Sequence, residues 1–168
     1  MDFFSYELII RLITSAFASA AFAVIFKINK RHLIYISICG ALAYLIYHTV
    51  IYFKGAEFLA ALVSTIFAAV FAETCARILH APATIYIITG VIPIFPGGNL
   101  YYTMSNFLEG DYEETFSQLL TTLGVGIGIA GGVVMVSVLF GIAYDINAKI
   151  KRMKRFIFCF PLWYLWRQ

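Results

Sequence analysis

The stretch that decides the fold is Thr89 to Met104, TGVIPIFPGGNLYYTM, because it interrupts an apolar run long enough to cross a membrane. Pro93 and Pro96 each remove a backbone donor and clash with the preceding turn of a helix. Gly97 and Gly98 follow at once and release the chain from helical dihedral angles. We therefore expect a membrane helix that is broken between Pro93 and Gly98. Non-helical backbone survives at membrane depth only where protein covers it or a water-filled cavity meets it.

The composition around this stretch is that of a membrane protein. The chain has 168 residues, of which 62% are hydrophobic and only 12% are charged, whereas a soluble domain carries about 25% charged residues. A water-soluble fold cannot bury that much apolar surface, and the apolar runs leave almost no residues for a separate soluble module. We expect a single all-α integral membrane domain over residues 1–168.

Five apolar stretches are long enough to span a bilayer, whose core of about 30 Å needs roughly 20 residues of helix. The predicted spans are residues 8–26, 33–53, 58–79, 84–104 and 119–143, and the fourth is the broken one. The first span begins beside Asp2 and Glu7 in place of a basic region and is long for a signal sequence, so we interpret it as a transmembrane helix.

The positions of the basic residues predict the orientation of these spans. With the N-terminus outside, ten of the twelve Lys and Arg residues fall in cytoplasmic segments, and only Arg11 and Lys54 lie near the other face. Since Lys and Arg favour the cytoplasmic side, the prediction is an N-out/C-in topology. The basic tail, residues 149–168, is then expected to anchor at the membrane interface, with positive charge toward anionic lipid.

Small residues at four-residue spacing predict where helix backbones approach closely within the membrane. Whether they pack within one subunit or against another chain is left open by the pattern itself. The stripes are Gly124, Gly128 and Gly132, with Gly126 and Gly131 beside them, in the fifth span; Ala68, Ala72 and Ala76 in the third; and Ser15, Ser19 and Ala23 in the first.

The broken helix is also the main candidate for a substrate site. The exposed N-terminus of a half-helix carries partial positive charge suited to a carboxylate, and interrupted helices of this kind form substrate sites in transporters. Asn99 and two tyrosines follow the break and offer hydrogen bonds to a polar solute. The alternative is a proline kink that binds no ligand. The predicted substrate-binding residues are Pro93, Pro96, Gly97, Gly98, Asn99, Tyr101 and Tyr102.

Glu73 and Arg77 form a second candidate site near the cytoplasmic end of the third span. Their spacing of four residues permits an ion pair on one helix face, and ionisable groups inside a span usually face a cavity or the bundle interior. Glu73 is the candidate for proton or substrate coupling; the alternative is an interfacial pair in which Arg77 extends to water. Arg11 is a further candidate, because its charge suits an anionic solute. The alternative is that its side chain extends to water at the membrane surface.

The remaining chemistry-bearing residues show no pattern of an enzyme or a metal site. The sequence has no HExxH motif, no serine/histidine/acid set and no paired intramembrane aspartates. Its cysteines, Cys39, Cys75 and Cys159, are scattered and odd in number, which favours neither a disulfide framework nor a metal cluster. We therefore expect no catalytic residue, no cofactor and no metal, and the placement of the basic residues argues against nucleic acid as a partner.

The segment from His80 to Met104, HAPATIYIITGVIPIFPGGNLYYTM, resembles the core of the threonine/serine exporter family, in its small-subunit, YjjB-like type. In that family a basic residue ends one helix, a proline opens the next loop, and an IPxFPG-like element interrupts the following span. The corresponding residues here are Arg77, Pro82 and the run from Ile92 to Gly97.

The resemblance implies a multi-pass subunit of the bacterial cytoplasmic (inner) membrane that exports a small carboxylate-bearing metabolite. Threonine, serine and succinate-like dicarboxylates are the substrates it implies, with proton coupling as the expected energy source. It also implies a larger, YjjP-like membrane subunit as partner, which carries a soluble domain that this chain lacks. A non-transporting scaffold that stabilises such a partner is the alternative function, and a homo-oligomer is an alternative assembly.

Overall fold

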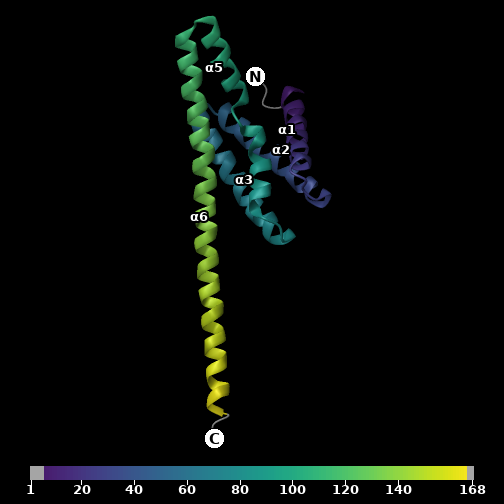
Figure 1. Ribbon diagram of the computed structural model, residues 1–168, viewed down its shortest axis with the longest axis vertical. Coiled ribbons are helices and arrows are strands. Elements are labelled where there is room, and N and C mark those ends of the chain that lie inside the picture. The colour runs from purple at the N-terminus through teal and green to yellow at the C-terminus, as the bar shows by residue number, and fades with distance from the viewer. Residues whose placement is uncertain (1–5, 166–168) are drawn as a thin grey trace.

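The computed structural model describes residues 6–165, with side chains for residues 6–144 and 146, and all regular secondary structure in that part of the chain is helical (Figure 1). The elements are α1 (Tyr6–Ile25), α2 (Lys30–Tyr52), α3 (Glu57–Leu79), α4 (Ala83–Val91), the short 3-10 helix η1 (Ile92–Ile94), α5 (Gly97–Glu109) and α6 (Tyr112–Leu165).

Four of the five predicted spans are present as single helices: α1, α2, α3 and the 112–144 part of α6 are each long and apolar enough to cross a membrane. The fourth predicted span is a pair of helices, α4–η1 and α5, bent by 49°, and the count is five when this pair is one span. The prediction of an all-α membrane protein with a broken fourth span is therefore confirmed. The structure extends two of the predicted spans: the fourth runs on to Glu109, and the fifth begins at Tyr112.

Local capping explains why these two spans are longer than the apolar runs alone suggest. Gly110 ends α5 in the left-handed conformation, at φ 84°, which glycine adopts without steric cost. Asp111 then caps α6, because its Oδ1 accepts the backbone N–H of Glu114 at 3.2 Å. The result is a tight turn between two polar helix ends that hydropathy does not assign to the spans.

The helix α3 lies at the centre of the bundle, in contact with α2, α4 and α6. Its side chains are small where these neighbours meet it, which allows the backbones to approach closely. The three alanines predicted as a packing stripe are all buried. The buried residues of α3 are Ala60, Ala61, Ser64, Thr65, Ala68, Ala69, Ala72, Cys75 and Ala76.

The glycines of α6 divide between this core and the surface. A Cβ added to Gly128 would lie 2.8 Å from the backbone oxygen of Phe58, and one added to Gly132 would lie 3.0 Å from Cβ of Thr65. These two glycines therefore pack against α3 within the same chain. A Cβ at Gly124 or Gly126 would meet nothing within 4 Å, so only part of the predicted glycine stripe serves the packing of this subunit.

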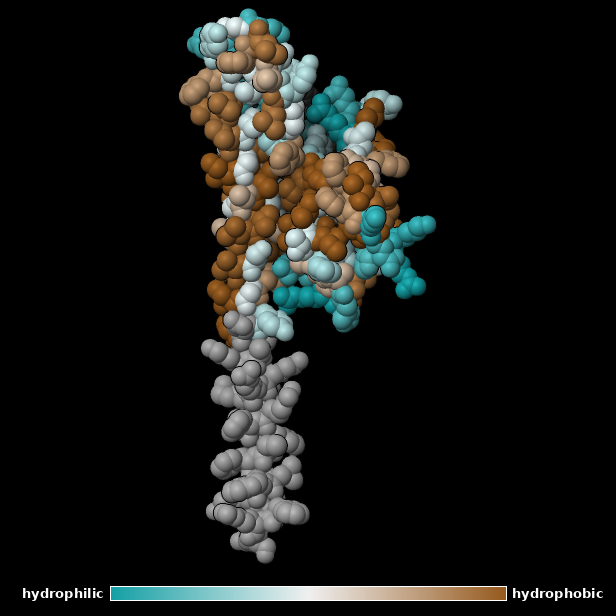
Figure 2. Space-filling model, viewed as in Figure 1, coloured by the Kyte–Doolittle hydropathy of each residue, from teal (hydrophilic) through white to brown (hydrophobic). Residues whose placement is uncertain are grey.

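Charged residues separate toward two ends of the bundle, with apolar surface between them (Figure 2). The turn before α2 and the end of α3 form a basic end, whereas the turn between α5 and α6 lies at the opposite, acidic end (Figure 1). Which end faces the cytoplasm stays a prediction from the positive charge. The basic end contains Lys27, Lys30, Arg31 and Arg77; the acidic end contains Glu109, Asp111, Glu113 and Glu114.

The basic tail continues α6 as helix as far as Leu165. The side chains of residues 147–168 lie outside those that the structure describes. The interfacial anchor predicted for residues 149–168 therefore stays a prediction.

Candidate functional site

The break in the fourth span is made by the second proline more than by the first. Ile92, which precedes Pro93, keeps right-handed helical dihedrals, and Pro93 lies inside the 3-10 turn η1. Phe95, which precedes Pro96, is extended at φ −60° and ψ 133°, as expected because the proline ring disfavours the helical conformation of the residue before it. The chain then restarts as α5 at Gly97, and the two half-helices meet at an angle of 49°.

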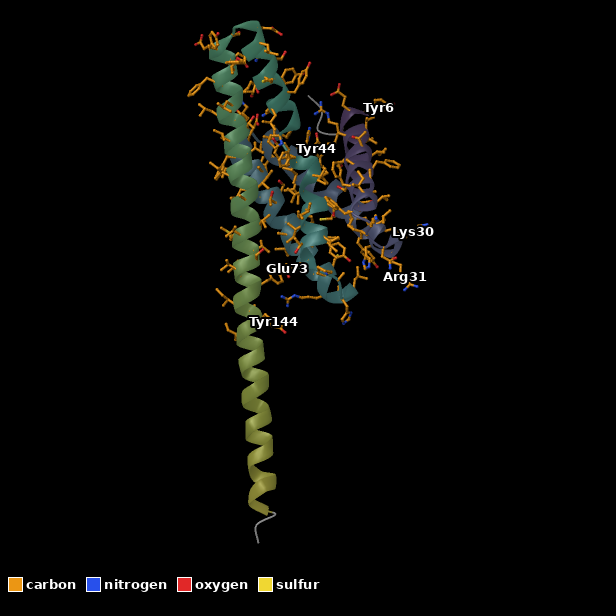
Figure 3. All side chains as sticks on the ribbon, in the orientation of Figure 1. Tyr6, Lys30, Arg31, Tyr44, Glu73 and Tyr144 are labelled. Atoms are coloured by element: carbon orange, nitrogen blue, oxygen red, sulfur yellow. The ribbon has the colours of Figure 1, made fainter. Side chains whose placement is uncertain are left out.

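A cleft of about 310 Å³ lies beside this break, between α1, α2 and η1. We call it the Arg11 cleft, because Arg11 is the charged residue among those that line it. Arg11 Nη1 donates to the hydroxyl oxygen of Tyr44 at 3.5 Å, and Tyr44 lies in the half of α2 away from the basic end (Figure 3). The lining residues are Arg11, Thr14, Ser15, Ala18, Tyr44 and Pro93.

One turn further along α1, the cleft gives way to a close contact of three elements. A Cβ added to Gly40 of α2 would lie 2.0 Å from Oγ of Ser19 and 3.4 Å from Cγ of Pro93. Only glycine allows α1, α2 and η1 to approach this closely. The Ser19 hydroxyl is buried and has no hydrogen-bond partner among the described residues.

The predicted site residues of α5 do not line the Arg11 cleft. Asn99 Nδ2 donates to Oε2 of Glu57 at 3.3 Å, which joins the start of α5 to the start of α3. Tyr101 and Tyr102 contact each other edge to face but are 69% and 57% exposed. A Cβ at Gly97 or Gly98 would meet nothing within 4 Å. Of the predicted substrate-binding set, the structure places only Pro93 in the Arg11 cleft, and Pro96 lies at the bend itself.

The second candidate pair forms the ion pair that its spacing permits. Arg77 Nη2 lies 3.9 Å from Oε2 of Glu73, with the Glu73 side chain 19% exposed and that of Arg77 49% exposed. The Arg77 guanidinium also stacks over the ring of Phe140 on α6, 4.9 Å from its centre. Glu73 lies toward the end that carries Lys30 and Arg31 (Figure 3). Neither residue of the pair lines the Arg11 cleft.

The contact between Arg11 and Tyr44 in the cleft is not predicted from the sequence. Snorkelling explains a single arginine near the end of a span, and nothing in the sequence indicates that Tyr44 lies beside it. One signal is present: Arg11, Ser15 and Ser19 share one face of the first helix at four-residue spacing. In the structure that face meets α2 and the broken helix.

A polytopic helical protein in which a cationic cleft meets an interrupted span has the architecture of a membrane transporter. The sequence profile described as "Threonine/Serine exporter, ThrE" matches residues 11–139, which is more than half of the chain. The chain therefore belongs to the threonine/serine exporter family, as the resemblance at His80 to Met104 predicts, and that family consists of membrane exporters rather than enzymes. No solved structure matches the chain.

Proposed function

We propose that this chain is a transporter subunit of the bacterial cytoplasmic membrane that exports a small metabolite, and that the Arg11 cleft binds the carboxylate of that metabolite. The observation that carries the proposal is the position of Arg11, which lines a cleft together with Pro93 and donates from its guanidinium to Tyr44. An ionisable residue within a span marks a substrate or ion pathway by default. Arginine also binds carboxylates through two parallel, charge-assisted hydrogen bonds.

The other polar groups of the cleft suit an amino acid. Thr14 and Ser15 donate their hydroxyl hydrogens to the backbone oxygens of Arg11 and Leu12, at 3.0 Å and 2.8 Å. Their oxygen atoms keep lone pairs that accept from an ammonium group. Threonine or serine would thus present its carboxylate to Arg11 and its ammonium group to these hydroxyls. A succinate-like dicarboxylate would use Arg11 alone at one end.

The open start of α5 supports a partner subunit. Phe95 is 63% exposed beside the bend, and none of the described residues of α5 is buried. The first N–H groups of any helix lack acceptors within the helix, and at membrane depth they need protein or water. In this proposal a larger, YjjP-like subunit covers the surface around Gly97 and Gly98, and Tyr101 and Tyr102 line the completed pathway.

Transport into inside-out vesicles that contain the chain and its partner tests the proposal. Arg11→Gln should lower kcat/KM for labelled threonine or succinate roughly ten- to hundredfold, because a hydrogen bond to a charged group contributes about 1.5–3 kcal/mol and about 1.4 kcal/mol is a factor of ten. Lys54→Gln is the matched control, since Lys54 is the other basic residue predicted on that side and does not line the cleft.

Two different results would contradict two different parts of the proposal, the carboxylate site and transport itself. If Arg11→Gln transports as well as Lys54→Gln at equal protein levels, the cleft is not the carboxylate site. If the wild-type chain supports no transport but raises the abundance of its partner, the chain is a scaffold.

A further inference from the structure

A second pocket, of about 200 Å³, lies at the basic end of the bundle. The turn between α1 and α2 forms one side of it, and the start of α4 forms the other. Its polar lining comes from Lys27, Asn29, His32 and Tyr86, and no Asp or Glu is among the described residues that line it. We call it the basic-end pocket. It carries positive charge with no carboxylate of its own to neutralise that charge.

The histidine of this pocket is held in place by a buried tyrosine. The Tyr86 hydroxyl lies 2.5 Å from Nδ1 of His32, and the two rings meet edge to face with their centres 5.8 Å apart. Tyr86 is 1% exposed, so its hydroxyl has little access to other partners. When Tyr86 donates to Nδ1, the ring hydrogen of His32 is on Nε2, which makes that nitrogen a donor. The Tyr86 contact thus gives His32, in the first turn of α2, a fixed ring orientation.

The lysine of the pocket is placed by a helix terminus. Lys27 follows α1 in the left-handed conformation, at φ 55°, and its backbone N–H donates to the oxygen of Val24 at 2.9 Å. Asn29, two residues further on, caps α2 by accepting the backbone N–H of Arg31 at 3.4 Å. The turn that carries Lys27, one of the lining residues of the pocket, is therefore tied to both helices.

The two pockets lie at opposite ends of one helix interface. The Arg11 cleft uses α1, α2 and η1, and the basic-end pocket uses the end of α1, the start of α2 and the start of α4. Between them the helices close: a Cβ at Gly40 would meet Ser19, and a Cβ at Gly90 would lie 2.8 Å from Sγ of Cys39. The two cationic pockets therefore lie on either side of one closely packed region, which we call the Gly40–Gly90 seal.

We propose that the basic-end pocket is a second binding site for the exported solute, where Lys27 and His32 bind its carboxylate before it passes the Gly40–Gly90 seal. This inference rests on the proposed export of a carboxylate-bearing metabolite. The small volume and the apolar walls, to which Phe26 and Ile85 contribute, suit a compact solute whose one end is anionic.

Kinetics from the basic face test the site. In vesicles that expose this face to the labelled solute, Lys27→Gln and His32→Gln should each raise KM about tenfold with little change in kcat. Lys30→Gln removes a neighbouring charge from the same turn, and Lys54→Gln removes a lysine with the same backbone conformation, at φ 56°, from the far end of α2. Neither control residue lines the pocket, and both variants should keep the wild-type KM.

A binding measurement that does not depend on turnover accompanies the kinetics. Lys27→Cys is introduced into a chain whose Cys39, Cys75 and Cys159 are replaced by alanine and that still transports, and labelling by an impermeant maleimide is followed. Threonine or succinate should slow labelling at least threefold, whereas Lys30→Cys should label at an unchanged rate.

The outcomes separate this inference from the proposed function. Transport with an unchanged KM in Lys27→Gln and His32→Gln overturns the second site and leaves export standing. Protection that follows the content of anionic lipid in the vesicle, and not the solute, assigns the pocket to a lipid headgroup and also overturns it. Absence of all transport by the wild-type complex overturns the proposed function, and the second site falls with it.

Discussion

The third and fourth spans are both apolar runs, yet they pack in opposite ways. On α3, nine residues are buried, nearly all of them small, and α6 lies against them through Gly128 and Gly132. On α5, none of the residues is buried. Small side chains let α3 become the centre of the bundle, whereas the prolines and glycines of the fourth span turn its second half away from that centre. The third span is thus the packed centre of the bundle, whereas in the fourth span α4 is packed against that centre and α5 is left exposed.

The largest effect on stability is expected at the α3–α6 contact. In Gly128→Ala the new methyl group would lie 2.8 Å from the backbone oxygen of Phe58, which cannot move like the end of a side chain. We expect a loss of about 1–3 kcal/mol, as for other overpacked cores. Thermal denaturation in detergent measures the loss as a lower midpoint.

Gly124→Ala is the control for that substitution, because it adds a methyl group to the same helix with nothing within 4 Å. Alanine favours a helix interior over glycine by about 1 kcal/mol, so this variant should be as stable as the wild type or more so. Equal destabilisation of both variants would show that the α3–α6 contact is not the scaffold.

Most of this scaffold can be predicted from the sequence, because hydropathy and small-residue spacing are properties of single helices. The five spans, the broken fourth and the buried alanine stripe all follow from such local patterns. Hydropathy does not show that Gly128 packs on α3 while Gly124 stays open. That difference depends on which face of α6 packs against α3, and this is a property of the tertiary structure.

The candidate site is less predictable for the same reason. The position of the break follows from Pro93 and Pro96, which act on their own turn of helix. The Arg11 cleft needs three segments far apart in the sequence, α1, Tyr44 and Pro93, and no local pattern brings them together. The sequence therefore indicates where the chain is interrupted, and the tertiary structure shows which charge meets the interruption.

Gly97→Ala, at the exposed start of α5, is expected to change transport more than stability. Nothing lies within 4 Å of the added methyl group, so stability should stay within about 0.5 kcal/mol of the wild type. If a partner subunit or the solute approaches this backbone, transport should nevertheless fall about fivefold at unchanged protein levels. Vesicle transport together with quantitative immunoblotting measures both quantities.

Pro96→Ala sharpens the same test. It restores a backbone donor and removes the ring that keeps Phe95 extended, so the bend should lessen and transport should fall further than in Gly97→Ala. Normal transport with normal expression in both variants would rule out the break as part of the site, and the fourth span would then be a proline kink.

A small effect on stability is also expected from Glu73→Gln, near the contact between α3 and α6. The ion pair is 3.9 Å long and Arg77 is half exposed, and exposed pairs contribute about 0–1 kcal/mol. The Arg77 guanidinium keeps its contact with Phe140 when the carboxylate is lost. The variant should therefore fold normally and serve as a clean probe of coupling.

Arg77→Gln is the matched variant, because it breaks the same ion pair but keeps the carboxylate that can carry a proton. If Glu73 couples export to protons, Glu73→Gln should lose the response of transport to an imposed pH gradient, while Arg77→Gln retains it. Transport that responds to the gradient equally in both variants would exclude Glu73 as the proton carrier. The pair would then serve the packing of α3 on α6, and the coupling group would have to be sought along the broken span or in the proposed partner subunit.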